Sequence, residues 1–328
     1  MDNDCVSAAI RGSAGLLTLE RPRALNALTT SMVETLQRLL AQLEADAAVR
    51  TLVLRSAEPR AFCAGGDMRR IRELCLAGQQ AEAERFFALE YALNLRLASL
   101  DRPIVALIDG LCMGGGLGLS VHGRYRVATE RAVFAMPETA LGFFPDVGGS
   151  FFLPRLPAAL GRWLGLTGAR LDGEEATALG LATHFVPHAR LGSLLEALAQ
   201  RGAEPVAQVL DRHAEPPSAA RLESIAADCA ATFGVAEDRS SLLEVLTRHG
   251  GEFARAALVD LQRASPHSLD VTLALFAAGQ WAPLAACLAH ELEAARAILR
   301  HPDFVEGVRA VLVDKTRDPR WTGAARST

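Results

Sequence analysis

Two buried strands that each lead into a glycine-rich turn constrain this chain more than any other feature. TLVLRS at residues 51–56 precedes FCAGGD at 62–67, and IVALIDG at 104–110 precedes MGGGLGL at 113–119. A repeated succession of strand, glycine turn and helical segment is typical of α/β proteins built from crossover units. Consecutive glycines also expose main-chain N–H groups and let another molecule approach the backbone. The sequence therefore predicts an α/β core with two main-chain binding turns.

Known glycine motifs do not account for these turns. A dinucleotide fingerprint fails from either possible start, because its last glycine is replaced by Leu119 or Val121. A serine-hydrolase elbow fails because GLSVH at 118–122 lacks its final glycine, and Ser120 and His122 do not face each other on a helix. One N–H group from each turn could instead converge on a single oxygen, as in an oxyanion hole. Tight packing of helix against strand is the alternative for either turn taken alone.

Composition excludes several classes of protein. The chain has 328 residues, a net charge of −4 and a pI near 6.1, with no basic stripe suited to nucleic acid. No apolar run approaches the roughly 18 residues of a membrane span, and residues 1–10 hold two acids and no basic residue, unlike a leader. Six scattered cysteines lack metal-site spacing and indicate reduced thiols. We expect a cytoplasmic protein with no metal, no nucleic-acid partner and no membrane contact.

The pattern along the chain changes near Pro187. Strands and glycine turns dominate before it, together with a helix that we expect to be capped by Ser31 in a capping box with Glu34. HAEPPS at 213–218 is typical of a linker, and the segments from Ala219 onward have helical periodicity. The predicted division is an α/β core at 1–190 and a helical C-terminal region at 191–328.

Two acids lie in an apolar stretch, MPETALGFFPDVGGS at 136–150. Burial raises the pKa of a carboxyl group, and a second carboxylate nearby raises one of the two further. Glu138 and Asp146 could therefore divide the roles of base and acid, with Phe143 and Phe144 helping to exclude water. The alternatives are structural: Glu138 as an acid at a helix N-terminus, and Asp146 as a cap of the glycine turn that follows it.

These segments resemble the enoyl-CoA hydratase/isomerase (crotonase) superfamily, and within it the branch that hydrolyses 3-hydroxyisobutyryl-CoA. The resemblance spans nearly the whole chain and is carried by these stretches: RPRALNAL (21–28), AFCAGGD (61–67), GLCMGGGLGLS (110–120), AMPETALGFFPDVGG (135–149), LTGARLDGEEATALGLATHFVP (166–187) and FVEGVRAVLVDKTRDPRW (304–321). It implies an α/β core of repeated ββα turns arranged as a spiral, with a helical C-terminal region. It also implies an acyl-CoA substrate and no separate cofactor.

The resemblance assigns the chemistry to particular residues. Main-chain N–H groups of Gly66 and Gly115 would hold the thioester oxygen, with Gly65 and Gly114 shaping the two turns. Glu138 would act as nucleophile or as general base on water. Asp146 would orient the substrate hydroxyl or the water, or would shuttle the proton.

Three further residues would support binding. Glu90 in FALEYALN would bind the substrate, although a solvated or structural glutamate is the alternative. Arg23 would meet the phosphates of CoA, with Arg309 and Lys315 as weaker candidates. Asp67 would fix the first glycine turn by accepting hydrogen bonds.

One departure selects the expected reaction. Family hydratases use two glutamates, and the first of these positions is Gly118 here. Glycine cannot transfer a proton, so we expect hydrolysis of a short-chain hydroxyacyl-CoA, with 3-hydroxyisobutyryl-CoA as the preferred substrate, a step of valine catabolism. An enoyl-CoA isomerase or atypical hydratase, and a non-catalytic CoA-binding protein, are the alternatives. The acyl-chain preference and the oligomeric state stay open.

Overall fold

The computed structural model describes residues 5–322, and their contacts divide them into two compact units. The first unit contains residues 5–66, 92–134 and 171–219, and the second contains 67–91, 135–170 and 220–322. The two units interleave along the chain, and the division at 190 and 191 stays a prediction about chain segments.

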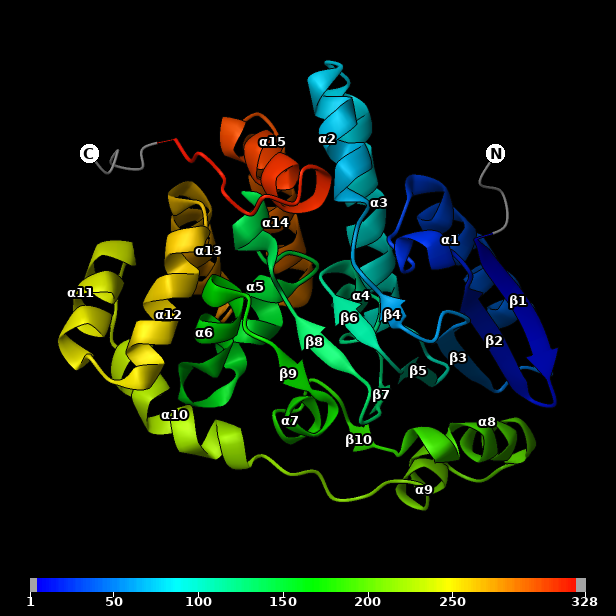
Figure 1. Ribbon diagram of the computed structural model, residues 1–328. Coiled ribbons are helices and arrows are strands. Elements are labelled where there is room, and N and C mark those ends of the chain that lie inside the picture. Colours follow the sequence, from blue (N-terminus) through cyan, green and yellow to red (C-terminus); the bar gives the residue numbers. More distant parts are fainter. Residues whose placement is uncertain (1–4, 323–328) are drawn as a thin grey trace. The chain divides into compact units, whose positions relative to one another are not determined.

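Two sheets form the first unit (Figure 1). The larger sheet has the order β1-β2-β3-β5-β7-β10, with β1 and β2 antiparallel and the later neighbours parallel. The smaller sheet has the order β4-β6-β8-β9. The strands are β1 (Val6–Arg11), β2 (Ala14–Leu19), β3 (Thr51–Ser56), β4 (Ala61–Cys63), β5 (Ile104–Ile108), β6 (Leu111–Met113), β7 (Tyr125–Ala128), β8 (Val133–Ala135), β9 (Leu171–Asp172) and β10 (His184–Phe185).

The predicted ββα repeat is confirmed by the strand order. β3, β5 and β7 are neighbours in the larger sheet, and each is followed along the chain by a strand of the smaller sheet, β4, β6 or β8. Helical segments then follow: α2 (Met68–Leu76), α4 (Gly115–Gly118) and the 3₁₀ turn η2 (Glu138–Leu141). In each repeat, the strand of the smaller sheet is therefore followed closely along the chain by a segment that carries or borders predicted site residues.

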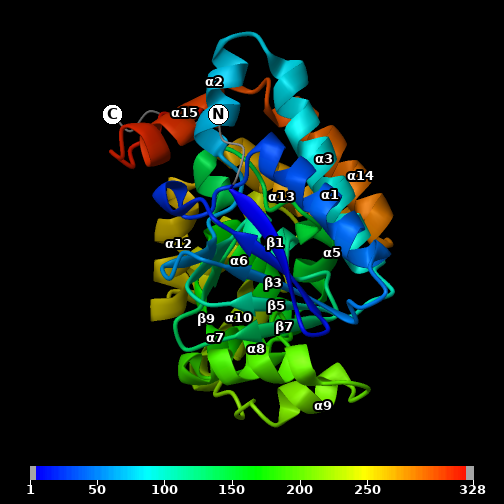
Figure 2. The same cartoon turned by 90° about the vertical axis from the view of Figure 1, so that its right-hand side faces the viewer.

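Helices cover the larger sheet because its strands are apolar on both faces. Val53 of β3 pairs with Val105 of β5, and both are fully buried against Leu194 and Leu198 of α8 (Leu191–Gln200). Figures 1 and 2 show α8 and α9 (Val206–Asp211) together beside this sheet. The other helices of this unit are α1 (Thr30–Ala45), α7 (Gly173–Ala178) and the last residues of α3 (Gln80–Ala98).

The N-terminus of α1 corrects one sequence prediction. Ser31 is not the cap, because Thr29 precedes the helix in extended conformation and its side chain accepts a hydrogen bond from the N–H of Met32. The Ser31 hydroxyl hydrogen-bonds to that of Thr29. Two adjacent threonines before the serine made the register of the cap ambiguous in the sequence.

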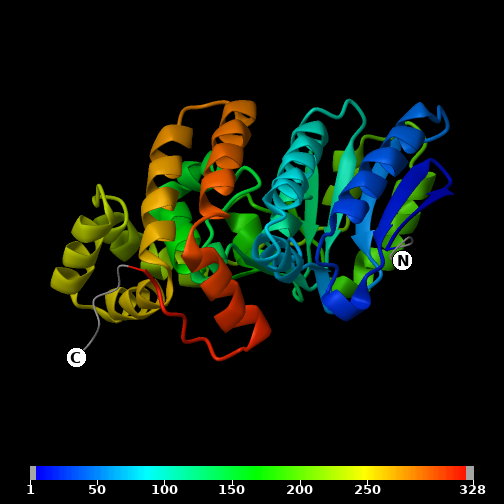
Figure 3. The same ribbon diagram turned by 90° about the horizontal axis from the view of Figure 1, so that it is seen from above.

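The second unit is mainly helical. Besides α2 and the first residues of α3, its helices are α5 (Gly149–Phe152), α6 (Leu160–Thr167), α10 (Ala220–Thr232), α11 (Arg239–His249), α12 (Glu252–Arg263), α13 (Pro266–Gly279), α14 (Leu284–Ile298) and α15 (Pro302–Val308). Short 3₁₀ or π turns are η1 (Pro22–Ala24), η3 (Leu153–Arg155), η4 (Pro157–Ala159), η5 (His188–Arg190) and η6 (Arg309–Val313), of which η1 and η5 belong to the first unit. Figure 3 shows α13 and α14, in gold and orange, side by side.

C-terminal helices fix the turn that begins with Glu138. The carbonyl of Thr139 in η2 accepts a hydrogen bond from the N–H of Ser265 at 3.0 Å. The hydroxyl of Ser265, which caps α13, donates in turn to Asp303 of α15 at 2.6 Å. These buried hydrogen bonds join η2 to α13 and α13 to α15, so the two helices help to fix where η2 lies.

Candidate active site

The two glycine turns of the first unit meet. Gly65 has a φ of +96°, and a Cβ placed on it would lie 3.1 Å from the carbonyl oxygen of Met113 and 3.5 Å from the nitrogen of Gly115. Gly114 also has a positive φ, of +48°, and Gly115 begins α4, so its N–H group has no acceptor within that helix. Only glycine allows this approach of one turn to the other. That Gly66 and Gly115 donate to one common atom stays a prediction.

The motif RPRALNAL holds the first glycine turn through hydrogen bonds. The N–H of Leu28 donates to the carbonyl of Gly65 at 2.8 Å. Asn26 is fully buried; its side-chain carbonyl accepts from the N–H of Arg21, and its amide donates to the carbonyl of Phe62 at 3.0 Å. Asn26 therefore has a structural role in this motif, and Arg23 is left exposed at its surface.

Asp67 has a more specific role than the sequence indicated. It is the N-cap of α2, and its side chain accepts a hydrogen bond from the N–H of Arg70 at 3.2 Å. It therefore fixes the start of the helix that follows the first glycine turn.

The second unit buries three predicted acids. Glu90, Glu138 and Asp146 expose 2%, 7% and 5% of their surface. Within residues 5–322, Oε1 of Glu90 and Oε2 of Glu138 have no hydrogen-bond partner. A solvated role for Glu90 is thus wrong. Buried polar atoms without a partner are rare in folded proteins and are explained by function or by a ligand.

The pKa values of these acids are mutually dependent. Burial raises the pKa of Glu138 well above its usual value, and the charge of Asp146 raises it further. Burial, Asp146 and Glu138 together raise the pKa of Glu90. The pKa of Asp146 is raised by burial to about 7, although a hydrogen bond from Tyr91 opposes the rise. Asp146 is therefore the acid of this cluster best able to hold a negative charge near neutral pH.

Tyr91 contacts Asp146 and also packs against a group of buried phenylalanines. The hydroxyl of Tyr91 donates to Oδ2 of Asp146 at 2.8 Å. The rings of Phe143 and Phe144 are fully buried and stack with centroids 4.5 Å apart, and Phe87 stacks on Phe143 at 5.0 Å. The expectation that Phe143 and Phe144 keep water from these acids agrees with this packing.

The turn after Asp146 is held by a residue that the sequence did not reveal. Asp146 and Gly149 close a turn through a main-chain bond of 2.7 Å. The N–H groups of Gly148 and Ser150 donate to the two carboxyl oxygens of Glu291 in α14, at 2.7 and 2.9 Å. Burial raises the pKa of Glu291 to about 8, against the effect of these donors. The structural alternative for Asp146 was that its side chain caps the glycine turn. In the structure, Glu291 accepts the hydrogen bonds of this turn.

A signal for the missed residues is present in the sequence. Glu291 occupies an apolar helix stripe formed by Cys287, Leu288, Ala295 and Ile298, which are buried. An acid at such a position must have a polar partner inside the protein. The same reasoning, applied to α3, identifies Tyr91 beside the predicted Glu90, since both follow Phe86 and Phe87 on its buried stripe.

The hydroxyl of Ser120 hydrogen-bonds to the main chain of α4. The hydroxyl of Ser120 is buried and donates to the main-chain carbonyls of Gly116 and Leu117. It therefore satisfies the short helix α4 and the turn that follows it.

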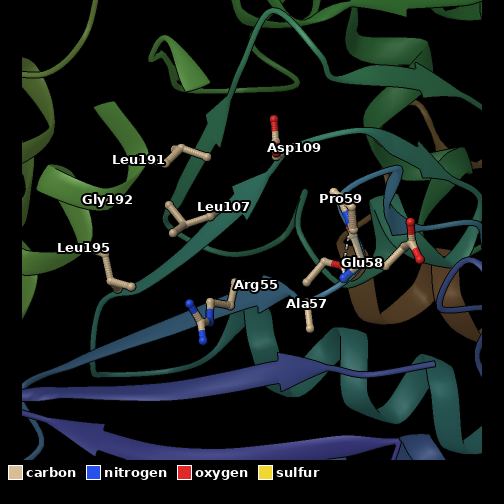
Figure 4. A pocket seen from close by; sticks show the side chains of 10 residues that line it. Arg55, Ala57, Glu58, Pro59, Leu107, Asp109, Leu191, Gly192 and Leu195 are labelled. Carbon is tan, nitrogen blue, oxygen red and sulfur yellow. Dashed lines mark hydrogen bonds between the residues drawn. The ribbon is translucent and has the colours of Figure 1, made fainter. Parts of the chain in front are cut away.

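A hollow in the first unit is lined by none of the predicted site residues (Figure 4). Its volume is about 260 Å³, and it is formed where β3 and β5 end beneath α8. Leu107, Leu191 and Leu195 supply its apolar wall, and Arg55, Glu58 and Asp109 supply its polar groups. Glu58 is already paired with Arg60, and Asp109 with Thr129 and His188.

Residues 5–322 contain neither a metal-binding cluster nor a membrane-spanning helix. Over this range, no group of His, Cys, Asp and Glu side chains has the arrangement to hold a metal ion. None of the helices described for these residues is long and apolar enough to cross a bilayer.

Comparison with known proteins gives the family. The model of the enoyl-CoA hydratase/isomerase family matches residues 14–327. The chain belongs to this family. The 3-hydroxyisobutyryl-CoA hydrolase, mitochondrial, of Rattus norvegicus is 43% identical over 96% of the chain and 83% of its own length.

Two solved structures have the same fold over nearly the whole chain. An enoyl-CoA hydratase from Rhodobacter sphaeroides 2.4.1 is 37% identical, with a TM-score of 0.89 over 97% of this chain and 92% of its own. A carnitinyl-CoA dehydratase from Mycobacterium thermoresistibile is 38% identical, also with a TM-score of 0.89, over 98% and 93%. The predicted spiral core with a helical C-terminal region is therefore confirmed.

Proposed function

We propose that this protein hydrolyses short-chain hydroxyacyl-CoA thioesters, and that 3-hydroxyisobutyryl-CoA is its preferred substrate. Curated relatives with that hydrolase name, 40–43% identical over about 95% of the chain, support the reaction. The structural observation that carries the proposal is the buried acid cluster, in which Glu138 and Glu90 each keep a carboxyl oxygen without a partner.

We assign the attack on the thioester to Glu138. Its raised pKa makes it a strong base once ionised, and its partnerless Oε2 can accept the proton of a water or form a bond to the carbonyl carbon. In either route a C–O bond forms, the carbonyl oxygen becomes an oxyanion, and the C–S bond then breaks. In the covalent route, water hydrolyses the resulting anhydride in a second step. Both routes release free CoA and the carboxylic acid.

The other predicted residues have supporting roles in this scheme. The N–H groups of Gly66 and Gly115 would stabilise the oxyanion, which is worth about 10²–10³ in rate for each donor. Asp146, whose charge the hydroxyl of Tyr91 favours, would pass the proton to the leaving sulfur or orient the substrate hydroxyl. The carboxyl of Glu90 would bind that hydroxyl, and the exposed Arg23 would meet CoA phosphates.

The test is thiol release from a panel of short acyl-CoAs. Glu138→Gln should lower kcat on 3-hydroxyisobutyryl-CoA by about 100-fold or more, because the amide cannot act as base or nucleophile. Glu175→Gln is the matched control, since Glu175 is equally buried but serves the capping box of α7. A loss below about tenfold in Glu138→Gln, or an equal loss in the control, would end the assignment.

An isomerase or atypical hydratase is the second candidate, because both solved relatives described above are named for hydration or dehydration. Gly118 argues against it, since glycine offers no proton at the position of the first hydratase glutamate. Hydration of crotonyl-CoA faster than thiol release from 3-hydroxyisobutyryl-CoA would favour this candidate. Binding of CoA esters without turnover of any would favour a non-catalytic protein.

Cofactor use, cellular location and oligomeric state are each tested separately. We propose that no cofactor is needed, because main-chain N–H groups can meet the developing charge. We also propose a cytoplasmic location, supported by six cysteines that lie within residues 5–322 and form no disulfide bond. Cell fractionation tests it against the mitochondrial location in the rat relative's name. Oligomerisation is open to light scattering of the purified protein.

A further inference from the structure

The turn that carries Asp146 holds an unfavourable backbone conformation. Val147 and Gly148 have φ values of +52° and +84°, and the N–H of Gly149 donates to the carbonyl of Asp146. Two successive positive φ values closed by such a bond are the pattern of a type I′ turn, which ordinarily uses Asn-Gly. A buried valine at the first position is an outlier, because a β-branched residue rarely adopts this conformation. Such conformations persist only where the surroundings impose them.

Glu291 supplies that constraint from a distant helix. Its Oε2 accepts from the N–H of Gly148 at 2.7 Å, and its Oε1 accepts from both the N–H and the hydroxyl of Ser150, at 2.9 and 2.5 Å. The side chain is fully buried, and 143 residues separate it from Gly148. Three donors that converge on two oxygens require a carboxyl group in place of an amide, since an amide would place its own N–H groups against main-chain N–H groups.

A second contact holds the other side of the turn. The backbone of Ser150 lies so close to α13 that a Cβ on Gly279 would come within 2.2 Å of the Ser150 carbonyl oxygen. Gly148 and Ser150 are thus fixed by the C-terminal helices, and Asp146 lies directly before this clamped segment. The only polar side chain seen to hold the Asp146 carboxyl itself, within residues 5–322, is Tyr91.

We propose that Glu291 is a positioning residue for the hydrolysis: it holds the turn at 147–150 so that the carboxyl of Asp146 stays where proton transfer needs it. This inference rests on the proposed function, in which Asp146 takes part in the chemistry. It assigns a role in catalysis to the C-terminal helical region, which contributes no residue to the sheets or to the glycine turns. A displacement of about 1 Å in such a group can lower a rate about 100-fold.

The experiment is a double-mutant cycle on thiol release by the full-length protein. Glu291→Gln should lower kcat by about 100-fold and change KM by less than about threefold, because the substrate contacts remain. In the Asp146→Asn background, the same substitution should lower kcat by less than about threefold, because no functional carboxyl is left to misplace. Glu175→Gln, which also removes a buried helix-capping carboxylate, should leave kcat unchanged in both backgrounds.

Other outcomes separate the inference from the function on which it rests. Equal losses from Glu291→Gln in both backgrounds would show a general structural role and overturn the inference, while the hydrolase assignment would stand. If Asp146→Asn kept the parent kcat while Glu138→Gln lost it, the positioning role of Glu291 would be overturned and the hydrolase assignment would stand. A silent Glu138→Gln would overturn the proposed function itself.

A milder variant covers the case in which Glu291→Gln does not fold. Ser150→Ala removes only the hydroxyl donor and keeps the N–H bond to Glu291. We expect a loss of kcat of about threefold to tenfold that disappears in the Asp146→Asn background. A loss that persists unchanged there, or no loss at all, would count against the positioning role.

Discussion

Asp146→Asn should make the protein more stable as well as less active. Burial raises the pKa of this aspartate from 3.8 to about 7, so the folded protein binds a proton that the unfolded chain has already released. Between these two values stability falls as pH rises, because the folded state then binds more protons than the unfolded state. Above pH 7 the ionised Asp146 lowers the free energy of unfolding by its full amount. That amount is about 4 kcal/mol, from about three pKa units at 1.36 kcal/mol each.

Asparagine removes this cost and keeps the shape of the side chain. Its carbonyl oxygen can still accept the hydrogen bond from Tyr91. The variant should therefore exceed the parent in free energy of unfolding by about 4 kcal/mol at about pH 8.5 and by about 2 kcal/mol at about pH 5.5. The charge of Asp146 also raises the pKa values of Glu90 and Glu138, so its removal acts on them in the same stabilising direction.

Urea unfolding at the two pH values measures both free energies. Parallel slopes for parent and variant would show that only stability has changed. Asp101→Asn is the control, because Asp101 is exposed and its substitution should leave the unfolding midpoint unchanged. A variant less stable than the parent at the higher pH, or a gain that does not vary with pH, would refute the reasoning from burial.

The remaining predictions concern activity. Tyr91→Phe removes the donor that lowers the pKa of Asp146, so the acidic limb of the pH–rate profile should move to higher pH by about one unit. An unmoved limb would show that Tyr91 does not control a pKa on which the rate depends. Gly116→Ala places a Cβ 2.5 Å from the carbonyl oxygen of Cys63 and must shift the second glycine turn, so kcat/KM for thiol release should fall at least about tenfold. Gly192→Ala meets nothing within 4 Å and should match the parent; similar rates for the two alanine variants would contradict the role of the turns. Incubation with EDTA should leave the rate unchanged, and a loss restored by a divalent cation would reveal a metal that the proposed chemistry does not use.

Local patterns in the sequence predicted the core well. The two glycine turns, the strands before them and the linker ahead of α10 all follow from short-range rules, and the structure has them at the expected residues. The resemblance to the family supplied what spacing could not, namely which glycine of each turn is expected to donate to the thioester oxygen. The cap of α1 was misplaced because competing caps stand within three residues of each other.

The contacts around the acids could not be predicted in the same way. The bond from Tyr91 to Asp146 spans 55 residues, and that from Gly148 to Glu291 spans 143. No periodicity links such positions, because their proximity depends on how α3, α14 and the loop fold together. The sequence does mark each residue as a polar group on an apolar stripe, which predicts a buried partner without identifying it.

The sign of the charges around the acids also bears on what happens after the bond is broken. The charges that act on Glu90 and Glu138 are negative, and each disfavours ionisation of the next. Cleavage of any acyl thioester replaces an uncharged acyl group by an anion, which a cluster of this kind repels. The acid product should therefore dissociate readily and rebind weakly. We expect the free acid to be a weak competitive inhibitor.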